Sequence, residues 1–502
     1  MAIGKKLFLR SVLLIVLLAL LSQPAFAAVK LPGIFSDHMV LQQDLPIKIW
    51  GTAKPAEKVQ VTLGNQHASC IANKSGNWHV VLEEARPGAV QELKIQGENL
   101  VVFKDVQVGE VFLCAGQSEL LDTVKSLSAS EHAVANSKLR IFVVPKRVST
   151  SPTGTLSGGW KVSSAVSGSN SSSVSDKASL SECSALAYNL GQNLQTNLKV
   201  PVGIIDCSYP ETPIASWVSK DRLMQMSVFR QILDPTLKAP EPTASSDGKP
   251  TLSSIAKPCV AYNGMVAPLV GYGLKAVCWY QGLHDLGQAV SYRKLLPMMI
   301  RDWRARWAQE PDVPFFFVQL PSSKIASNTF DINSLPACVG VANSWINMRD
   351  AQATALAVGS TAMVVTTDYA NHASLNHLDG LPGRLSQAIL AKLFEAKKTA
   401  FGPLYEGYDS QGSAIKVHFS NAKSGLALRL KAGQPTGFEM IDTKGRTFPA
   451  EVKIVESDLL VSSPQVLNPI EVRYDWKDAA KATLFNVENL PAAPFRISIR
   501  PN

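Results

Sequence analysis

The stretch VGEVFLCAGQSELL, residues 108–121, contains the transition on which the interpretation of this chain depends. An apolar run ends at Gly116 and is followed by Gln117 and Ser118. In one interpretation, this triplet is a turn that caps the next helix. In the other, Ser118 is a nucleophile at a strand-to-helix corner, although the second glycine of the G-x-S-x-G elbow is missing. These residues alone do not choose between the two.

The apolar run before Gly116 is the first of six that alternate with helical patterns. Runs that are apolar throughout are typical of strands in a sheet covered by helices on both faces. They are VFLCA, RIFVVP, VPVGIID, LKAVCWY, VPFFFVQL and TAMVVTTD. Four other segments place apolar residues at helical spacing: SLSECSALAYNLGQNLQTNL, SYRKLLPMMIRDWRARW, NMRDAQATALA and GRLSQAILAKLFEA. The sequence therefore predicts a doubly wound α/β domain over residues 106–400.

Short alternating segments flank this domain on both sides. Before it, PIKIWG, KVQVTLG, GNWHVVL and QELKIQG alternate apolar and polar residues between turns. After it, AIKVHFS, GLALRLK, EVKIVES and IEVRYDW have the same character. Alternation of this kind predicts strands with one face exposed to water. We therefore expect an N-terminal β module over residues 28–105 and a C-terminal β module over residues 401–502.

The first 27 residues have the pattern of a secretory signal peptide. Lys5, Lys6 and Arg10 precede the apolar run SVLLIVLLALL, and Ala-Phe-Ala follows at residues 25–27 as a small-x-small cleavage site. We expect cleavage before Ala28 and export to the periplasm or the extracellular space, with no membrane association beyond export. The alternative is an uncleaved anchor.

Composition excludes some classes of function and leaves others open. The chain has 502 residues, 46% of them apolar, and a formal charge of +9, but its basic residues are scattered and form no block of the kind that binds nucleic acid. Its seven cysteines include no C-x-x-C pair, so neither a zinc ribbon nor a thioredoxin-type site is expected. One or two disulfides are compatible with export, but no pairing follows from the sequence.

Ligands of α/β sheets bind beyond the carboxyl ends of the strands, which selects four loops. Ser118 follows the first strand, residues 208–212 follow VGIID, and Gln281-Gly282 follows AVCWY. The loop YANHASLNHLDG, residues 369–380, follows VVTTD. In a regular sheet these loops converge on one edge. A serine early in the chain and a histidine late in it suit a hydrolase.

Long collinear blocks of the chain resemble the sialate O-acetylesterases. They include LPGIFSDHMVLQQDLPIKIWGTAKP, GEVFLCAGQSEL, KVPVGIIDCSYPETPIASW, YNGMVAPLVGYGLKAVCWYQG, GPLYEGYDSQGSAIKVHFS and NVENLPAAPFR, and they span residues 31–496. These proteins are SGNH-type carbohydrate esterases. The resemblance implies a doubly wound, flavodoxin-like SGNH-hydrolase core flanked by β-sandwich-like modules. It also implies an acetylated carbohydrate as the substrate.

The resemblance places Ser118 at the position of the family's nucleophile. A histidine would take the serine proton, and an acetyl-serine would then be cleared by water. Oxyanion and pocket positions carry over to five residues, Gln117, Glu119, Gln281, Gly282 and Asp285. This chemistry needs neither a metal nor an organic cofactor, and the resemblance does not determine the oligomeric state.

The chain departs from the family's pattern at three of these loops. Glu119 replaces the asparagine that follows the nucleophile. Pro210-Glu211-Thr212-Pro213 replaces Gly-Gly-Thr-Pro, so that a glycine N–H is replaced by proline, which has none, or by a bulkier residue. The run Gln281 to Asp285 replaces Gln-Gly-Glu-Ser-Asn and removes a carboxylate.

The last loop offers two candidate bases, His372 and His377. We favour His377, because His-Leu ahead of the Gly-Arg-Leu helix resembles the family's approach more closely. In the alternative, one or both histidines form hydrogen bonds in a surface loop. Asp368 and Asp379 are candidate orienting carboxylates or turn caps.

The segment NMRDAQ contains two further candidates, Arg349 and Gln352. They match a family helix that faces the site, and a solvated helix face is the alternative.

Three functions remain open on this evidence. The first is an exported esterase that removes O-acetyl groups from sialic acid or another acetylated glycan. The second is a catalytically impaired relative that binds carbohydrate or acts as a scaffold. The third is an esterase for a different acylated sugar.

Overall fold

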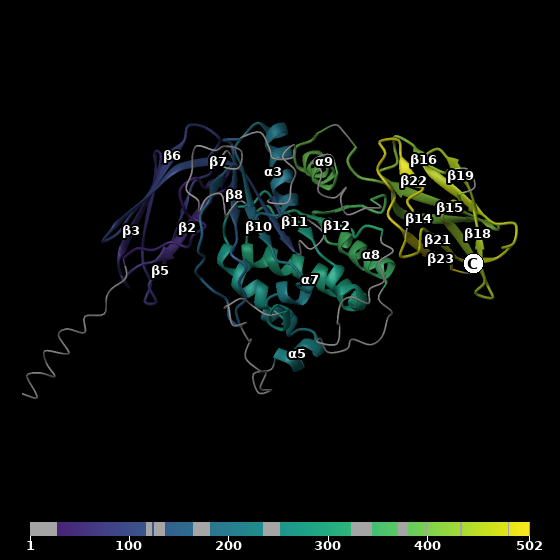
Figure 1. Cartoon of the computed structure of the whole chain (residues 1–502), viewed down its shortest axis with the longest axis horizontal. Coiled ribbons are helices and arrows are strands. Elements are labelled where there is room, and N and C mark those ends of the chain that lie inside the picture. Colours follow the sequence, from purple (N-terminus) through teal and green to yellow (C-terminus); the bar gives the residue numbers. More distant parts are fainter. Residues whose placement is uncertain are drawn as a thin grey trace, which may run out of the picture.

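Three groups of elements follow one another along the long axis of the molecule: a β region, a central α/β region and a second β region (Figure 1). The computed structural model describes residues 28–116, 123–124, 136–163, 181–233, 252–322, 344–369, 380–396, 399–431, 434–479 and 481–500. Gln117, Ser118, Glu119, His372, His377 and Asp379 lie outside these ranges.

The central region is built on a sheet whose order is β13-β12-β11-β7-β10-β8-β9. The first six of these strands run parallel, and the short β9 pairs antiparallel at the edge. Their bounds are β7 Leu100–Gly116, β8 Leu139–Val143, β9 Lys161–Val162, β10 Val202–Ser208, β11 Ala276–Tyr280, β12 Phe315–Val318 and β13 Thr361–Val364. Each of the six predicted runs therefore overlaps a strand of one sheet, and a mixed α/β fold is confirmed.

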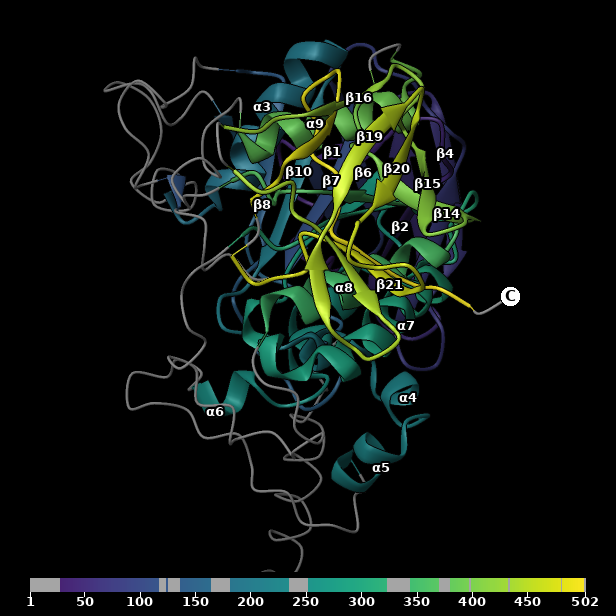
Figure 2. The same ribbon diagram turned by 90° about the vertical axis from the view of Figure 1, so that its right-hand side faces the viewer.

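Helices cover both faces of this sheet (Figures 1 and 2). On one face, α3 (Ala185–Leu198) packs against α9 (Leu381–Leu393), and on the other α7 (Ala289–Trp307) packs against α8 (Trp345–Ala353). Each of the four predicted helical segments overlaps one of these helices, although α7, α8 and α9 each begin two residues before the predicted segment. Shorter pieces complete the region: η3 Ile214–Trp217, α4 Lys220–Leu223, α5 Ser227–Leu233, α6 Leu252–Ile255, η4 Tyr262–Val266, η5 Ala267–Leu269, η6 Leu283–Gln288 and η9 Thr354–Ala357.

The N-terminal strands are continuous with the central sheet through β7. The first half of β7 pairs antiparallel with β6. Its last seven residues pair with β10, and the last five of these also pair with β11. The predicted module boundary at residue 105 thus falls inside one strand, and a single hydrophobic core extends across it. The other strands are β1 Val40–Gln42, β2 Ile47–Thr52, β3 Lys58–Leu63, β4 Gln66–Ile71, β5 Asn77–Leu82 and β6 Gln91–Gln96.

The C-terminal strands form two four-stranded antiparallel sheets around a second core. One sheet has the order β14-β15-β20-β19 and the other β18-β17-β21-β23, while β16 and β22 form a pair. Alternate residues of the inner strands point into this core, as the alternating pattern predicted. The bounds are β14 Leu404–Gln411, β15 Ala414–Ser420, β16 Leu426–Leu428, β17 Phe438–Asp442, β18 Thr447–Pro449, β19 Glu451–Val455, β20 Asp458–Ser462, β21 Pro469–Tyr474, β22 Leu484–Asn486 and β23 Phe495–Ser498.

One buried arginine attaches the C-terminal strands to the α/β region. Arg349 of α8 donates to the carbonyls of Lys477 and Asp478 through one guanidinium nitrogen and to Pro321 O through another. The Asp478 carboxylate in turn accepts from Ser344 at the start of α8. This network is buried or half-buried, so the junction is a fixed contact between two cores.

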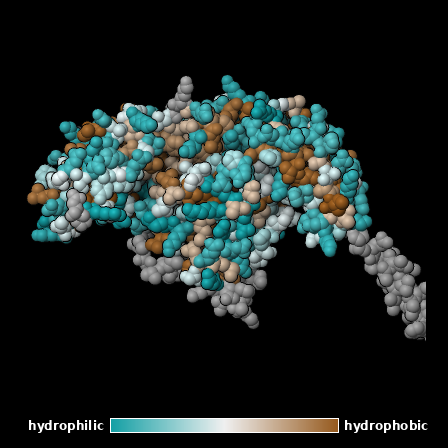
Figure 3. Space-filling view, turned by 180° about the vertical axis from the view of Figure 1, so that it is seen from behind, coloured by the Kyte–Doolittle hydropathy of each residue, from teal (hydrophilic) through white to brown (hydrophobic). Residues whose placement is uncertain are grey.

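The surface shows small apolar patches among hydrophilic side chains on the face opposite to Figure 1 (Figure 3). Within the described ranges, no helix has the length and apolar character needed to cross a bilayer. The six cysteines that fall in these ranges are free thiols.

Candidate functional site

The winding of the central sheet reverses at β7, next to β11. From the central β7 the chain goes first to β8 and β10 on one side and then to β11, β12 and β13 on the other. In open α/β sheets, ligands bind where the direction of winding reverses in this way. Gly116 ends β7 and Tyr280 ends β11, and the two residues are paired in register. The reversal therefore lies between the strands that lead to Gln117-Ser118 and to Gln281-Gly282.

Gly116 occupies a position that other residues would fit poorly. Its φ is +114°, in a region that L side chains rarely adopt. A Cβ on this residue would lie 2.3 Å from Tyr280 O, while the Gly116 carbonyl accepts from Tyr209 N–H at 2.8 Å. The strand thus ends on glycine because two neighbouring chain segments approach its backbone closely.

The loop after β11 is tied to the loop after β10. Gln281 is buried, and its Nε2 donates to Thr212 O at 3.1 Å and to Asp285 Oδ2. The same Asp285 oxygen accepts from Ile214 N at 2.9 Å. Both predicted pocket residues therefore brace the two loops against each other.

Asp285 is buried, and burial raises the pKa of its carboxyl group to about 6, although the hydrogen bonds from Gln281 and Ile214 act in the opposite direction. A carboxyl group with this pKa is mostly ionised at neutral pH and mostly protonated below pH 5. In its protonated form it can donate a hydrogen bond, as the family's asparagine can.

Gly282 has a positive φ of 141°, and a Cβ there would lie 3.1 Å from Gln352 Nε2. Gln352 is buried, and its Nε2 donates to Gln281 O and Val318 O, while its Oε1 accepts from Leu320 N. Gln352 thus fastens the ends of β11 and β12 together. With Arg349 also buried, the alternative of a solvated helix face for these two residues is wrong.

Asp368 follows β13, and Arg384 of α9 binds it through two hydrogen bonds. Arg384 Nη1 donates to Asp368 Oδ1 at 2.8 Å and Nη2 to Oδ2 at 2.7 Å. Because both carboxylate oxygens are engaged, this pair anchors the start of the loop that contains the two candidate histidines. His284, the residue before Asp285, is half-buried, and burial lowers its pKa, which favours the neutral imidazole.

Several buried polar atoms at this edge have no hydrogen-bond partner among the residues that the structure describes. They are Tyr280 Oη at the end of β11, Gln281 Oε1 next to it, Gln319 Oε1 after β12 and Thr367 Oγ1 after β13. Buried polar groups normally have partners, so a group of orphans calls for an explanation such as a ligand or an ordered water. Sequence analysis did not single out Gln319, which directly follows β12, or Thr367, which lies three residues beyond β13.

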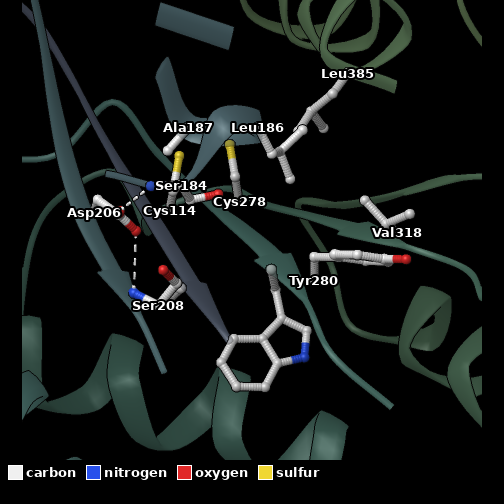
Figure 4. A pocket seen from close by; sticks show the side chains of 12 residues that line it. Cys114, Ser184, Leu186, Ala187, Asp206, Ser208, Cys278, Tyr280, Val318 and Leu385 are labelled. Carbon is white, nitrogen blue, oxygen red and sulfur yellow. Dashed lines mark hydrogen bonds between the residues drawn. The ribbon is translucent and has the colours of Figure 1, made fainter. Parts of the chain in front are cut away.

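A small cavity opens on the α3 face of the same edge (Figure 4). It has a volume of about 20 Å³, enough for one water molecule. Gln281, Gly282 and Asp285 are absent from the described residues that line it, which are Cys114, Ala115, Ser184, Leu186, Ala187, Asp206, Ser208, Cys278, Trp279, Tyr280, Val318 and Leu385.

The polar side of this cavity is Asp206, a residue that sequence analysis also passed over. It is buried on β10, and its carboxylate accepts from Ser184 N at 2.7 Å, at the start of α3, and from Ser208 N at 3.2 Å. The sequence does mark this residue, because Asp206 is the one acidic residue in the apolar run VGIIDCS. Burial raises the pKa of Asp206.

The cysteines of the cavity are poor candidates for a nucleophile. Cys114 and Cys278 face each other on neighbouring strands (Figure 4). A hydrogen bond with Cys278, followed by burial, holds the pKa of Cys114 well above its usual value. Since the thiolate is the reactive form, Cys114 is inert in this setting. Within the described ranges, no cluster of three His, Cys, Asp or Glu side chains is arranged to hold a metal ion.

Comparison with known proteins tests the resemblance. The rat sialate O-acetylesterase is 27% identical over 359 residues, which are 64% of this chain and 65% of the rat protein. The human sialate O-acetylesterase is 28% identical over 311 residues, 57% of this chain and 56% of that protein. The chain is a homologue of the sialate O-acetylesterases. No protein-family model matches it.

A solved structure extends the similarity over more of the chain. The carbohydrate acetylesterase from Xanthomonas citri superposes with a TM-score of 0.74 and 26% sequence identity, covering 94% of this chain and all of that one. The alignments with the rat and human proteins span less than two thirds of those proteins' length. These comparisons confirm the resemblance to the sialate O-acetylesterases that the sequence predicted.

Proposed function

We propose that this chain is a serine esterase that removes O-acetyl groups from sialic acid or another acetylated glycan, and that its central region is an SGNH-type core. The observation that carries the proposal is the group of buried polar atoms at the carboxyl ends of the central strands that have no hydrogen-bond partner among the described residues. The names of the rat, human and Xanthomonas relatives supply the reaction class. The signal-like pattern of residues 1–27 supports export to the periplasm or the extracellular space.

In this proposal, Ser118 attacks the acetyl carbonyl carbon while His377 takes the serine proton. The tetrahedral intermediate then expels the sugar oxygen, which receives the proton from His377, and leaves an acetyl-serine. Water attacks the acetyl-serine with the same histidine as base and releases acetate. The chemistry requires no cofactor and no metal.

The oxyanion needs preorganised hydrogen-bond donors, each worth about 2 to 4 kcal/mol of barrier lowering. Gly282 lies two residues beyond β11 and has a φ of +141°, a conformation that glycine adopts readily. Asp285 can donate only when protonated. The Gln281 amide nitrogen already donates to Thr212 O and Asp285. Both of its hydrogens are therefore used between the loops and are not available to an oxyanion.

One pair of proteins tests this function. Purified mature chain and its Ser118→Ala variant are assayed with p-nitrophenyl acetate and with O-acetylated sialic acid. We expect turnover of both esters by the wild type and its loss, by a factor of at least about 10³, in the variant. A His377→Ala variant that retains full activity, beside an inactive His372→Ala variant, would reverse the assignment of the base.

A catalytically impaired carbohydrate-binding protein is the second candidate. It is favoured by the commitment of Gln281 and Asp285 to bracing the loops and by Pro210, which offers no N–H where the family has glycine. Wild-type protein that binds an acetylated glycan but cleaves no acetyl ester above background would establish this candidate.

Glu119 separates the two candidates further. A carboxylate about 4 Å from the developing oxyanion would oppose it by roughly 4 kcal/mol at an effective dielectric of about 20. Glu119→Asn should therefore raise kcat by about tenfold or more, since 1.4 kcal/mol is one decade in rate. The measurement is kcat for p-nitrophenyl acetate, with Glu182→Asn as the control at another site. An unchanged rate in Glu119→Asn would mean that the carboxylate points away from the reacting oxygen.

A further inference from the structure

A second and much larger cleft lies between the β2–β5 ribbon and the α/β region. Its volume is about 510 Å³, against about 20 Å³ for the cavity at the strand ends. This falls within the range of about 300 to 1,000 Å³ that is typical of ligand sites. Residues 154–155 and 267–270 form one wall, and the ribbon with residues 30–32 forms the other.

The ribbon presents one aromatic ring and several hydrogen-bonding side chains to this cleft. In the antiparallel register Trp50 lies opposite His79, and Thr52 lies opposite Asn77, so all four share one face. Trp50 is half-buried, and its ring meets Phe35 edge-on with centroids 4.7 Å apart. Trp50 is therefore held in place while part of its surface stays accessible to a ligand.

The charge of the cleft is positive. Lys30 and Lys48 line it, and the described lining residues include neither aspartate nor glutamate. The Lys48 ammonium reaches across to the other wall, 3.5 Å from where a Cβ on Gly271 would lie. Neither lysine forms an ion pair with any described residue. Two uncompensated ammonium groups in a concave site attract an anion.

We propose that this cleft binds an oligosaccharide whose sugars carry carboxylates. Trp50 offers a flat apolar surface to a sugar ring, the side-chain amide of Asn77 matches sugar hydroxyls, and the two lysines match carboxylates. The carbohydrate class, in place of an acidic peptide, rests on the proposed function. The anionic character rests on the lysines alone.

The cleft is remote from the strand ends. Tyr272, two residues beyond the cleft wall, donates to Val40 O, and Val40 is paired with Gln107 of β7. Gln107 lies nine residues before Gly116, which is about 30 Å along a strand. A glycan held in the cleft would raise the local concentration of acetylated sugars near the strand ends without contacting the reacting groups.

The test measures binding and does not depend on turnover. Isothermal titration calorimetry on the Ser118→Ala protein uses oligogalacturonate, its methyl-esterified counterpart of equal length, oligosialic acid and polyglutamate. We expect at least one of the two acidic glycans to bind. We also expect tenfold or greater weakening when the carboxylates of oligogalacturonate are esterified, and loss of affinity as salt is raised.

Charge reversal locates the site. Lys30→Glu/Lys48→Glu should weaken binding at least tenfold, while Lys58→Glu/Lys104→Glu, at exposed positions that do not line the cleft, should change it less than twofold. If the charge-reversed protein melts early, Lys48→Met keeps the aliphatic stem and repeats the test. Unchanged binding in Lys30→Glu/Lys48→Glu, or no binding of either acidic glycan, overturns the proposal.

Polyglutamate that binds as tightly as the glycans overturns the carbohydrate class. A failure of the proposed function would look different. The wild-type protein would then cleave no acetyl ester, while calorimetry would still detect binding of the glycan.

Discussion

Gly116 shows how a single residue positions this site. The sequence raised the question of why a strand should close on a glycine before a serine, and the backbone answers it. At φ +114°, with Tyr280 O where a Cβ would lie, only glycine avoids both strain and overlap. The conformation also directs the Gly116 carbonyl to Tyr209 N–H, which joins the ends of β7 and β10.

Gly116→Ala should therefore destabilise the protein by about 2 to 5 kcal/mol, from backbone strain and overlap together. Urea unfolding followed by circular dichroism measures the loss. Gly359→Ala is the control, because a Cβ there meets nothing within 4 Å, and its effect should stay below about 1 kcal/mol. Equal stabilities for the two variants would show that β7 can shift at its end without cost.

The loops that follow β10 and β11 act as one unit through a buried carboxyl group. Asp285 accepts from Ile214 N and from Gln281, and the same glutamine reaches Thr212 O. Two loops that are about 70 residues apart in the chain are thus held by a group that is costly to ionise where it sits. We therefore expect the stability of this link to depend on pH.

The pH dependence of unfolding follows from the raised pKa of Asp285. Burial raises it from 3.8 to about 6, so the folded state binds this proton more tightly than the unfolded state does. The protonated Asp285 carboxyl group contributes fully to the free energy of unfolding below about pH 4. This contribution declines as the pH rises through 6 and is absent above that. Asp285→Asn has no such group to titrate. The difference in the free energy of unfolding between this variant and the wild type should therefore shift in favour of the variant by up to about 3 kcal/mol between pH 4 and pH 8.

Chemical unfolding of wild type and Asp285→Asn at pH 4.5 and pH 8 measures the difference. Asp312→Asn, at an exposed position, is the control and should follow the wild type at both values. If Asp285→Asn lowers stability at pH 8 as well, the carboxylate contributes favourable hydrogen bonds that outweigh its burial.

The molecule holds its two cores together through buried polar contacts. Arg349 is fully buried and donates to carbonyls of both the α/β region and the C-terminal strands. Burial lowers its pKa to about 10, and the guanidinium remains charged at neutral pH. Its loss would leave three carbonyls without their donor.

Arg349→Leu should lower the free energy of unfolding by about 3 to 5 kcal/mol, because a buried polar network loses its central donor. It should also make the region around residues 399–403 a site of limited proteolysis. Arg429→Leu, an exposed arginine of the C-terminal strands, is the control, with an expected change below about 1 kcal/mol. Resistance to protease equal to that of the wild type would mean that the junction does not depend on this residue.

The sequence alone was sufficient for the central strands, the four long helices and the family. These follow from local periodicity and from long collinear blocks, which need no knowledge of distant contacts. The identities of Ser118 and the pocket residues also came from the sequence, by resemblance, and the assignment of Ser118 and His377 stays a prediction. The same holds for export and for the module boundaries.

Other features required the three-dimensional structure. The continuity of β7 between two regions, the bracing role of Gln281 and Asp285, and the burial of Arg349 depend on partners that lie far away in the chain. Trp50 and His79 are 29 residues apart and share a face only because of the register of β2 and β5. Periodicity indicates which face of an element is buried, whereas tertiary packing decides which atoms come into contact there. The chemistry at the strand ends and in the cleft beside β2 and β5 depends on those contacts.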